Sequence, residues 1–165
     1  MPEPAIEFRA ALRQLLAAQV RFVVIGGVAM HLHGANNFTL DLDISYARDP
    51  ANCTALANAL SQQHAHLRGV PVDLPFVLDA RTFRNTINLT LDTDIGEFDL
   101  LGEPAGIESF ESLWEHAVVM NIEGMTVHVA SIDDLIAMKR AANRPKDQNH
   151  LLELYALKKL IEEQT

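Results

Sequence analysis

FVVIGGVAMHLHGANNFTLDLD, residues 22–43, is the stretch of sequence that decides the fold. Phe22–Ile25 is a short apolar run with β-branched residues, which predicts a buried strand. Gly26 and Gly27 end this run, and the residues after them suit a short helix. Leu40–Ile44 alternates apolar and acidic side chains with the period of a half-buried strand. The stretch therefore predicts a strand, a glycine turn, a helix and a second strand.

The two aspartates of the second strand carry the first functional signal. Asp41 and Asp43 stand two residues apart, so both project to one face of the strand while Leu42 points to the other. Two like charges roughly 7 Å apart repel each other unless a positive charge lies between them. Mg²⁺ supplies such a charge, because it takes hard oxygen ligands and keeps positions open for substrate phosphates. A strand face with two solvated aspartates is the alternative interpretation.

A glycine turn and a third carboxylate strengthen this signal. Gly26 and Gly27 lie between a strand and a helix, where glycine lets the backbone approach a phosphate closely; a plain tight turn has the same sequence. Asp99 lies in Glu97–Leu101, another stretch expected to form a strand. Three carboxylates on adjoining strands beside such a turn predict phosphoryl transfer, in which two metal ions bind a triphosphate and activate an acceptor oxygen.

The rest of the chain predicts helices and strands around this centre. Helices are expected at residues 6–18, 28–33, 50–64, 110–116, from Ser131 to about 142, and at 145–163. Strands are expected at residues 72–78, 86–91, 97–101, 118–122 and 125–129. Together they predict an α/β (α+β) fold, a mixed β-sheet flanked by helices. We expect a single domain over residues 1–165, with a helical C-terminal part from about residue 131.

Composition argues against several classes of protein. The chain has 165 residues, 48% of them hydrophobic, and contains no run of the roughly 18 to 20 apolar residues that crosses a bilayer. Its N-terminus does not resemble a signal peptide, and its one cysteine, Cys53, cannot form an internal disulfide, so a cytoplasmic location is expected. The formal charge of −9 argues against nonspecific binding to DNA or anionic membranes, which would repel it.

A known superfamily shares the pattern of the opening stretch. The segment from Gly26 to Asp43 resembles the DNA polymerase β-like nucleotidyltransferases, in which a Gly-Gly or Gly-Ser is followed by a helix and then by an acidic D-x-D strand. The similarity covers roughly residues 20–155 and points to a small bacterial and archaeal branch. That branch includes toxin-type proteins related to the abortive-infection AbiEii group. The further similar segments are Leu74–Phe76, Asn88–Thr90, Gly96–Gly102, Ile132–Ile136, Lys139-Arg140 and Arg144–Asp147.

The resemblance implies a nucleotidyltransferase-like fold and a role for each candidate residue. Ligands for Mg²⁺ or Mn²⁺ are implied at Asp41, Asp43 and Asp99. Asp99 would also act as the base toward the acceptor hydroxyl. Contacts to the phosphates of a nucleoside triphosphate are implied at Gly26, Gly27, Lys139 and Lys146. For the two lysines, solvated positions on helices are the alternative interpretation.

One position departs from the pattern of the superfamily. Members commonly have a basic residue two positions before the threonine of the acidic motif, where this chain has Asn37. Asparagine donates hydrogen bonds but does not neutralise the charge of a phosphate. Either Arg48, Arg140 or a lysine compensates for this loss, or turnover is weak.

Three functions stay open from the sequence. The first is transfer of a nucleoside monophosphate from a nucleoside triphosphate to a hydroxyl of RNA, a protein or a small molecule, with release of pyrophosphate. This enzyme would suit the toxin of a toxin–antitoxin pair. The second is a catalytically weakened nucleotide-binding module that acts through a protein partner, such as an antitoxin. The third is a metal-dependent phosphohydrolase, which would release phosphate instead of pyrophosphate.

Overall fold

A mixed β-sheet occupies the centre of the molecule. The computed structural model describes residues 8–37, 39, 41–71, 73 and 77–164. Within these residues the sheet has seven strands, in the spatial order β3 (His66–Leu67), β4 (Asn88–Thr93), β5 (Gly96–Leu101), β2 (Asp41–Tyr46), β1 (Phe22–Ile25), β7 (Met125–Val129) and β6 (Val118–Ile122). The pairs β2–β5 and β1–β7 are parallel, and the other neighbours are antiparallel.

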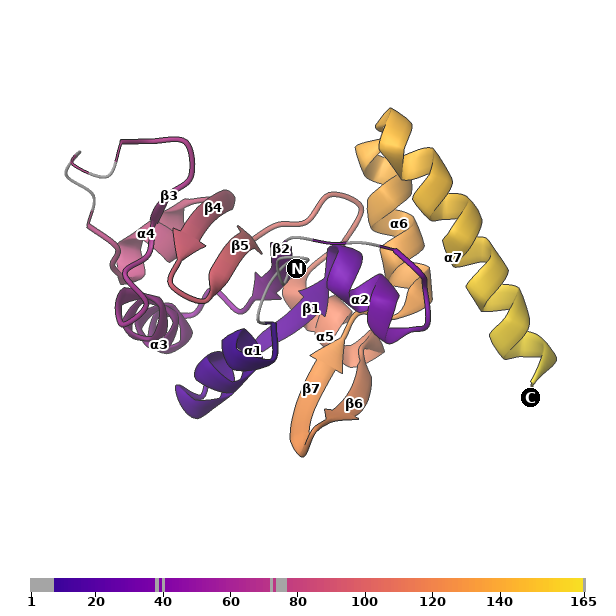
Figure 1. Ribbon diagram of the computed structural model, residues 1–165, viewed down its shortest axis with the longest axis horizontal. Helices are drawn as coiled ribbons and strands as arrows, with labels where there is room; N and C mark the ends of the chain where they lie inside the picture. Colours follow the sequence, from indigo (N-terminus) through magenta and orange to yellow (C-terminus); the bar gives the residue numbers. More distant parts are fainter. Residues whose placement is uncertain (1–7, 38, 40, 72, 74–76, 165) are drawn as a thin grey trace, which may run out of the picture.

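Helices flank this sheet on its faces and at one end. In the described residues they are α1 (Phe8–Ala17), α2 (Gly26–Leu32), α3 (Pro50–Ser61), α4 (Ala80–Asn85), α5 (Phe110–His116), α6 (Ile132–Ala142) and α7 (Pro145–Glu163). Helices α6 and α7 lie side by side, at the end of the molecule remote from α3 and α4 (Figure 1). The predicted mixed sheet with flanking and C-terminal helices is confirmed.

Two expected boundaries near the central strands differ, and each has a local cause. The helix expected at residues 28–33 begins at Gly26, so both glycines belong to its first turn and not to a loop before it. The strand expected at residues 86–91 begins only at Asn88, because Thr86 is still the C-terminal cap of α4 and its N–H donates to the carbonyl of Thr82.

The segment after α3 differs most from the prediction. The helix expected at residues 50–64 ends at Ser61, and His64 has a positive φ of 52°, which a right-handed helix does not allow. The strand expected at residues 72–78 lies partly outside the described residues, as does the similar segment at 74–76; the described residues of this stretch form no strand. The short elements β3 and α4 flank this stretch and were not expected.

Strands β2 and β5 each have one buried apolar face, and their carboxylates lie on the opposite face. The side chains of Leu42, Ile44 and Leu100 are completely buried, whereas Asp41 and Asp43 of the same β2 strand are only partly buried. This alternation follows from the two-residue period of a strand. The expected half-buried strand with its carboxylates on one face is therefore confirmed.

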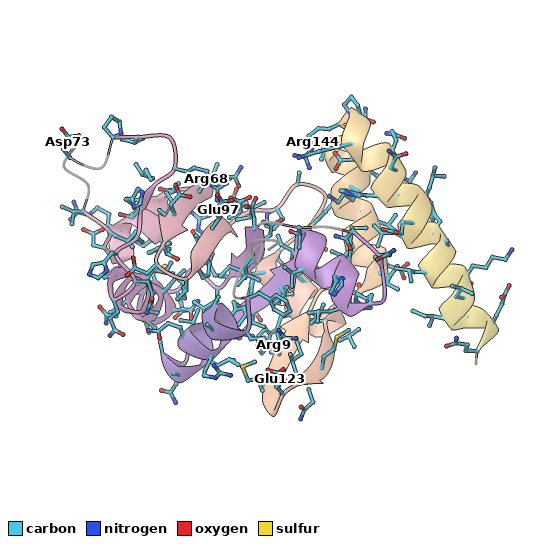
Figure 2. The ribbon with its side chains drawn as sticks, viewed as in Figure 1. Arg9, Arg68, Asp73, Glu97, Glu123 and Arg144 are labelled. Atoms are coloured by element: carbon cyan, nitrogen blue, oxygen red, sulfur yellow. The ribbon has the colours of Figure 1, made fainter. Side chains whose placement is uncertain are left out.

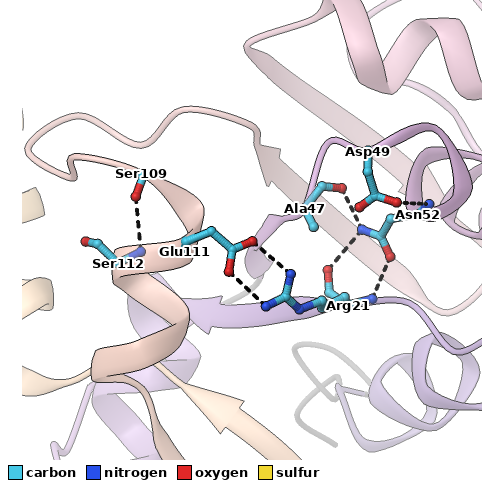
Figure 3. A network of polar contacts seen from close by, with 7 residues as sticks. All are labelled: Arg21, Ala47, Asp49, Asn52, Ser109, Glu111 and Ser112. Atoms are coloured by element: carbon cyan, nitrogen blue, oxygen red, sulfur yellow. Dashed lines mark hydrogen bonds and ion pairs between the residues drawn. The ribbon is translucent and has the colours of Figure 1, made fainter.

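A buried asparagine ties the beginning of β1 to the end of β2 (Figure 3). The Asn52 side chain accepts from the Arg21 N–H at 2.7 Å and donates to the carbonyls of Arg21 at 3.0 Å and Ala47 at 2.6 Å. The N–H of Asn52 donates in turn to the Asp49 carboxylate at 3.1 Å, which caps α3. Arg21 also makes a bidentate ion pair with Glu111 of α5, at 2.8 and 3.0 Å. Two strands and two helices are thus fixed at one corner.

Capping residues and a proline determine where the C-terminal helices begin and end. Ser131 caps α6 by accepting from the N–H of Asp134 at 3.1 Å, and Asn143 ends the helix in the left-handed conformation, at φ 49°. Pro145 then occupies the first turn of α7, where its missing N–H costs no hydrogen bond. None of the helices in the described parts of the chain has the length and apolar character needed to cross a membrane.

Candidate active site

Three carboxylates meet on the exposed face of β2 and β5. Asp43 of β2 lies opposite Asp99 of β5 in the parallel pairing, and Asp41 lies opposite Glu97. Asp41, Asp43 and Asp99 each offer a carboxylate oxygen, and these three oxygens lie within 4.8 Å of one another. We call these three residues the carboxylate triad. The sheet register brings together two residues that are far apart in the sequence.

The triad has the chemistry of a divalent cation site. One buried oxygen, Oδ1, of each of the three carboxylates lacks a hydrogen-bond partner among the described residues. Buried polar atoms nearly always have hydrogen-bond partners, so three clustered carboxylates that each have an oxygen without one leave room for a further positive partner, although Nη1 of Arg68 lies 3.6 Å from Oδ1 of Asp99. Carboxylate oxygens are hard ligands of the kind that Mg²⁺ and Mn²⁺ prefer. The residues therefore fit the metal ions implied by the sequence.

Burial and the crowding of negative charge raise the pKa of Asp43 and Asp99. Burial, followed by the charges of Asp99 and Asp41, raises the pKa of Asp43 to about 8. Burial and the charge of Asp41 also raise the pKa of Asp99. A group in a low-dielectric site with like charges nearby resists ionisation, and a bound cation would remove that resistance. Such strongly perturbed carboxylates cluster at functional sites.

The two glycines are required by the shape of the site. Gly26 has a φ of +66°, and a Cβ added there would lie 2.0 Å from Oδ2 of Asp43. A Cβ on Gly27 would lie 2.9 Å from the side chain of Thr39. Asn37 donates a 3.0 Å hydrogen bond to the carbonyl of Gly27. The glycines therefore lie directly against the triad and the acidic strand, as expected.

Cationic side chains of α6 and α7 face the triad. Asp147, completely buried, holds two of them: its carboxylate lies 3.4 Å from Nζ of Lys139 and 2.8 and 3.1 Å from the guanidinium of Arg144. These bonds lower the pKa of Asp147. Burial lowers the pKa of Lys139, and the nearby Asp147 opposes this effect. The buried Asp147 thus places two cations toward Asp43, whose charge also acts on Lys139 and Arg144.

A polar cavity joins the triad to these cations. Its volume is about 330 Å³, and it is lined by Gly27, Asn37, Thr39, the three triad aspartates, Lys139, Arg144, Lys146 and His150. A cavity whose wall carries both carboxylates and cations suits a metal-bound polyanion. The structure therefore brings all seven of the predicted site residues into one neighbourhood, with Gly26 lining an adjoining cavity.

Arg68, just after β3, is a site residue that the sequence did not reveal. Its Nη1 lies 3.6 Å from Asp99 and 3.8 Å from Asp41, and its Nε donates to Asp92 at 3.1 Å. Figure 2 shows Arg68 beside Glu97 on the sheet, with Arg144 across from them on the helical side. No local motif marks Arg68, because it reaches the triad only through the pairing of β3 with β4.

The side chains expected as substitutes for a basic residue at position 37 differ in where they lie. Arg48 bonds Glu103 at 2.9 Å and lines a different cavity. Arg140 is exposed and lines neither the polar cavity nor the adjoining one. Lys139, Lys146 and Arg144 do line the polar cavity, which favours the alternative that a lysine supplies the charge.

A family of known proteins matches most of the chain. A family described as "Nucleotidyltransferase of unknown function (DUF6036)" matches residues 6–162 of the chain. No curated protein sequence matches it.

Three solved structures share the fold at low sequence identity. The lincosamide antibiotic adenylyltransferase LnuA, solved with lincomycin bound, is 14% identical, with a TM-score of 0.61 over 92% of this chain and 96% of that one. The antibiotic-resistance factor ANT(2″)-Ia is 14% identical, with a TM-score of 0.53 over 91% and 82%. An antigenic nucleotidyltransferase-like protein from Paracoccidioides brasiliensis is 19% identical, with a TM-score of 0.51 over 92% and 73%. At these identities the likeness shows the fold alone.

Proposed function

The chain belongs to the DUF6036 family of nucleotidyltransferases, and on that premise we propose that it transfers a nucleoside monophosphate from a nucleoside triphosphate to a hydroxyl of a small-molecule acceptor. One observation carries the proposal: three carboxylates, each with a buried oxygen that lacks a hydrogen-bond partner among the described residues, cluster beside a cavity lined by cations. That combination suits a metal-bound triphosphate better than any single anion or cation.

The arrangement of charges supports the following reaction. The acceptor oxygen attacks the α-phosphorus and forms a new P–O bond, while the bond from that phosphorus to the bridging oxygen breaks and pyrophosphate leaves. Asp99 takes the acceptor proton, and Lys139 and Lys146 stabilise the charge on the departing pyrophosphate. Divalent metal ions held by the triad would neutralise the phosphates and lower the pKa of the acceptor hydroxyl.

A small molecule is the acceptor that the comparisons favour. LnuA, which shares the fold over most of both chains, is an adenylyltransferase of a lincosamide antibiotic. RNA or protein as the acceptor, the AbiEii-type branch, the toxin role and the antitoxin partner stay predictions. The weakened binding module also stays an alternative, because Asn37 carries no charge, although three other cations line the polar cavity.

Transfer of label tests the proposal directly. The protein is incubated with each α-³²P-labelled nucleoside triphosphate, Mg²⁺ or Mn²⁺, and separate cellular fractions of small molecules, RNA and protein. Asp41→Asn combined with Asp43→Asn removes two of the proposed ligands at nearly constant volume. Asp94→Asn, an exposed carboxylate at the turn between β4 and β5, is the matched control.

The outcomes separate the candidate functions. Label in the small-molecule fraction with wild type and Asp94→Asn, absent with the double variant, supports the proposal, and pyrophosphate must appear as the second product. Label in RNA or protein would move the acceptor to that class. Release of inorganic phosphate would favour the phosphohydrolase. Tight nucleotide binding without transfer to any fraction would favour the binding module.

A further inference from the structure

His150 of α7 lines the polar cavity but has no part in the reaction described so far. Lys146 and His150 stand four residues apart on α7, so their side chains lie one above the other on the same face of the helix. Both line the polar cavity together with Arg144 and with Lys139 of α6. A histidine thus takes its place among the three cations of this cavity.

The two nitrogens of the His150 ring have different surroundings. Nδ1 is buried and has no hydrogen-bond partner among the described residues. Because the ring lines the polar cavity while Nδ1 is closed off from solvent, Nε2 is the nitrogen that a ligand in the cavity can reach. Buried polar atoms nearly always have partners, so an unpaired ring nitrogen in a cavity wall is unusual for a residue that only packs.

The surroundings of His150 favour its neutral ring. Burial, followed by the charge of Lys139, lowers its pKa; the charges of Asp147 and Glu153 oppose this effect, and that of Lys146 adds to it. A charged ring would also place a proton on the enclosed Nδ1, which has no acceptor among the described residues. Phosphate oxygens accept hydrogen bonds, so Nε2 meets them as a donor. The neutral ring with its proton on Nε2 satisfies both conditions.

We infer that His150, given the proposed function, is a further catalytic residue, which donates a hydrogen bond from Nε2 of its neutral ring to an oxygen of the departing pyrophosphate. Negative charge on the pyrophosphate grows as its bond to the α-phosphorus breaks. A donor fixed beside that charge therefore stabilises the transition state more than it stabilises the bound triphosphate. The proton stays on Nε2 throughout, so the ring adds a directed donor without adding a further charge that would retain the product.

Two amides that resemble opposite edges of the imidazole ring test the role of Nε2. In His150→Gln the amide nitrogen can take the place of Nε2, whereas in His150→Asn it reaches only the place of Nδ1. His150→Ala removes both groups. The matched control is His64→Asn, at an exposed histidine whose left-handed backbone asparagine tolerates.

Three quantities are measured for each of these proteins. They are kcat and KM for transfer of label as a function of pH, and the dissociation constant of pyrophosphate with Mg²⁺ by calorimetry. Circular dichroism shows that each variant is folded. The calorimetry does not depend on turnover, so it tests the hydrogen bond separately from the reaction.

The expected result is a loss of kcat that glutamine repairs. His150→Ala and His150→Asn should lower kcat about ten- to hundredfold and change the KM for the nucleoside triphosphate less than about threefold, because the bond strengthens in the transition state. Both should bind pyrophosphate about three- to tenfold more weakly. His150→Gln should recover most of both losses. Its pH profile should match that of wild type, because the ring transfers no proton.

Several results would overturn the inference. If kcat of His150→Gln is as low as that of His150→Ala, and both lose one limb of the pH profile, His150 transfers a proton as a general acid. If kcat is the same in wild type and all three variants, His150 only packs. A raised KM with unchanged kcat would mean that it binds the triphosphate and the transition state equally.

Failure of the proposed function would look different. Wild type would then transfer no label to any acceptor, while the calorimetry would still give an answer. Weaker pyrophosphate binding by His150→Ala and His150→Asn, recovered in His150→Gln, would support the hydrogen bond from Nε2 without the proposed reaction. Equal pyrophosphate affinity in wild type and His150→Ala would refute the hydrogen bond whatever the fate of the label.

Discussion

The raised pKa of Asp43 makes the stability of the protein depend on pH. Its folded-state pKa of about 8 lies far above that of an unfolded aspartate, so its ionised form is disfavoured in the fold. The protein therefore loses stability as the pH rises from about 4 through 8, and above 8 the full penalty remains. The absence of a side chain at Gly26 leaves room for this carboxylate, and the charge of Lys139 opposes part of the rise in its pKa.

Asp43→Asn should therefore stabilise the metal-free protein. At pH 9 in EDTA we expect the free energy of unfolding to rise by roughly 1 to 3 kcal/mol, because a neutral amide replaces a crowded charge. At pH 4, where wild-type Asp43 is protonated, the two proteins should unfold alike. Urea titrations at both pH values measure this, with Asp94→Asn as the control. A lower stability of Asp43→Asn at pH 9 would show that the carboxylate is not under electrostatic strain.

Arg68→Gln should bind metal more tightly than wild type. The guanidinium lies 3.6 to 3.8 Å from two triad carboxylates and competes electrostatically with a cation there. We expect the dissociation constant for Mn²⁺, measured by electron paramagnetic resonance, to fall about three- to tenfold. Arg81→Gln removes an exposed arginine of α4 and should change nothing. Weaker Mn²⁺ binding by Arg68→Gln would mean that Arg68 orients the carboxylates instead of competing for them.

Single residues differ in how far the sequence reveals them. Asp41 and Asp43 follow from the period of one strand, and the structure places them as predicted. Asp99 was found because it too lies in an apolar strand, although only the sheet register brings it to Asp43. Arg68 has no such pattern. Its proximity depends on which strands pair, and that is decided by contacts across the whole sheet.

At the level of elements, the corner formed by α3, β1 and β2 depends on Asn52. Asn52→Ala would leave the carbonyls of Arg21 and Ala47 and the N–H of Arg21 without their partner in a buried place. We expect a loss of about 2 to 4 kcal/mol in the free energy of unfolding. Asn58→Ala, at an exposed position of the same helix, should cost less than about 1 kcal/mol. Equal losses in chemical denaturation would show that the network contributes little.

The junction of α6 and α7 should depend on pH through Asp147. Its lowered pKa stabilises the fold at every pH above the unfolded value of about 4, and that contribution is lost as the pH falls toward the folded value. Asp147→Asn should cost roughly 2 to 4 kcal/mol at pH 7, because Lys139 and Arg144 lose a buried partner.

The matched control for this prediction is Asp133→Asn. Asp133 is an exposed carboxylate of α6 that pairs with Lys158 at 2.8 Å, and exposed pairs contribute little. The difference in stability between wild type and Asp147→Asn should shrink as the pH is lowered below 4. A difference that stays constant with pH would show that packing, and not the charge of Asp147, holds the junction.

Elements were predictable where local chemistry is strong. Ser131, Asn143 and Pro145 mark the ends of α6 and α7, and both helices agree with the prediction. The β6–β7 hairpin also agrees, and its turn has positive φ values at Glu123 and Gly124, of which glycine favours the second. Helix α4 was missed, although Asp79 and Thr82 form a capping box that could have revealed it.

At the scale of the whole molecule, metal binding should appear as global stability. The triad joins β2 and β5 at the centre of the sheet, so a metal bound there is released when the sheet unfolds. Mn²⁺ at a hundred times its dissociation constant should add about 2.7 kcal/mol to the free energy of unfolding. EDTA should reverse the gain. The Asp41→Asn and Asp43→Asn double variant should show no gain, and a gain equal to wild type would place the metal elsewhere.

The overall fold was predictable because the chain alternates helices and strands with clear periods. The order of strands was not, since the placement of β3 and β4 next to β5 follows from long-range packing. The two cavities beside Asp43 were also beyond prediction, because α6 reaches β5 only in three dimensions. The net charge of −9 likewise did not predict that cationic side chains gather around the polar cavity.

The contact between Gly26 and Asp43 gives a rule for comparing related sequences. The place of a side chain at position 26 is already taken by the carboxylate oxygen of residue 43, 2.0 Å away. The two positions therefore cannot drift independently during evolution. A relative that has glycine at 26 and aspartate at 43 can keep this packing, whereas a bulkier residue at 26 requires that the carboxylate has moved or been lost. Positions 26 and 43 of an alignment would therefore show which relatives can keep this carboxylate in the same place.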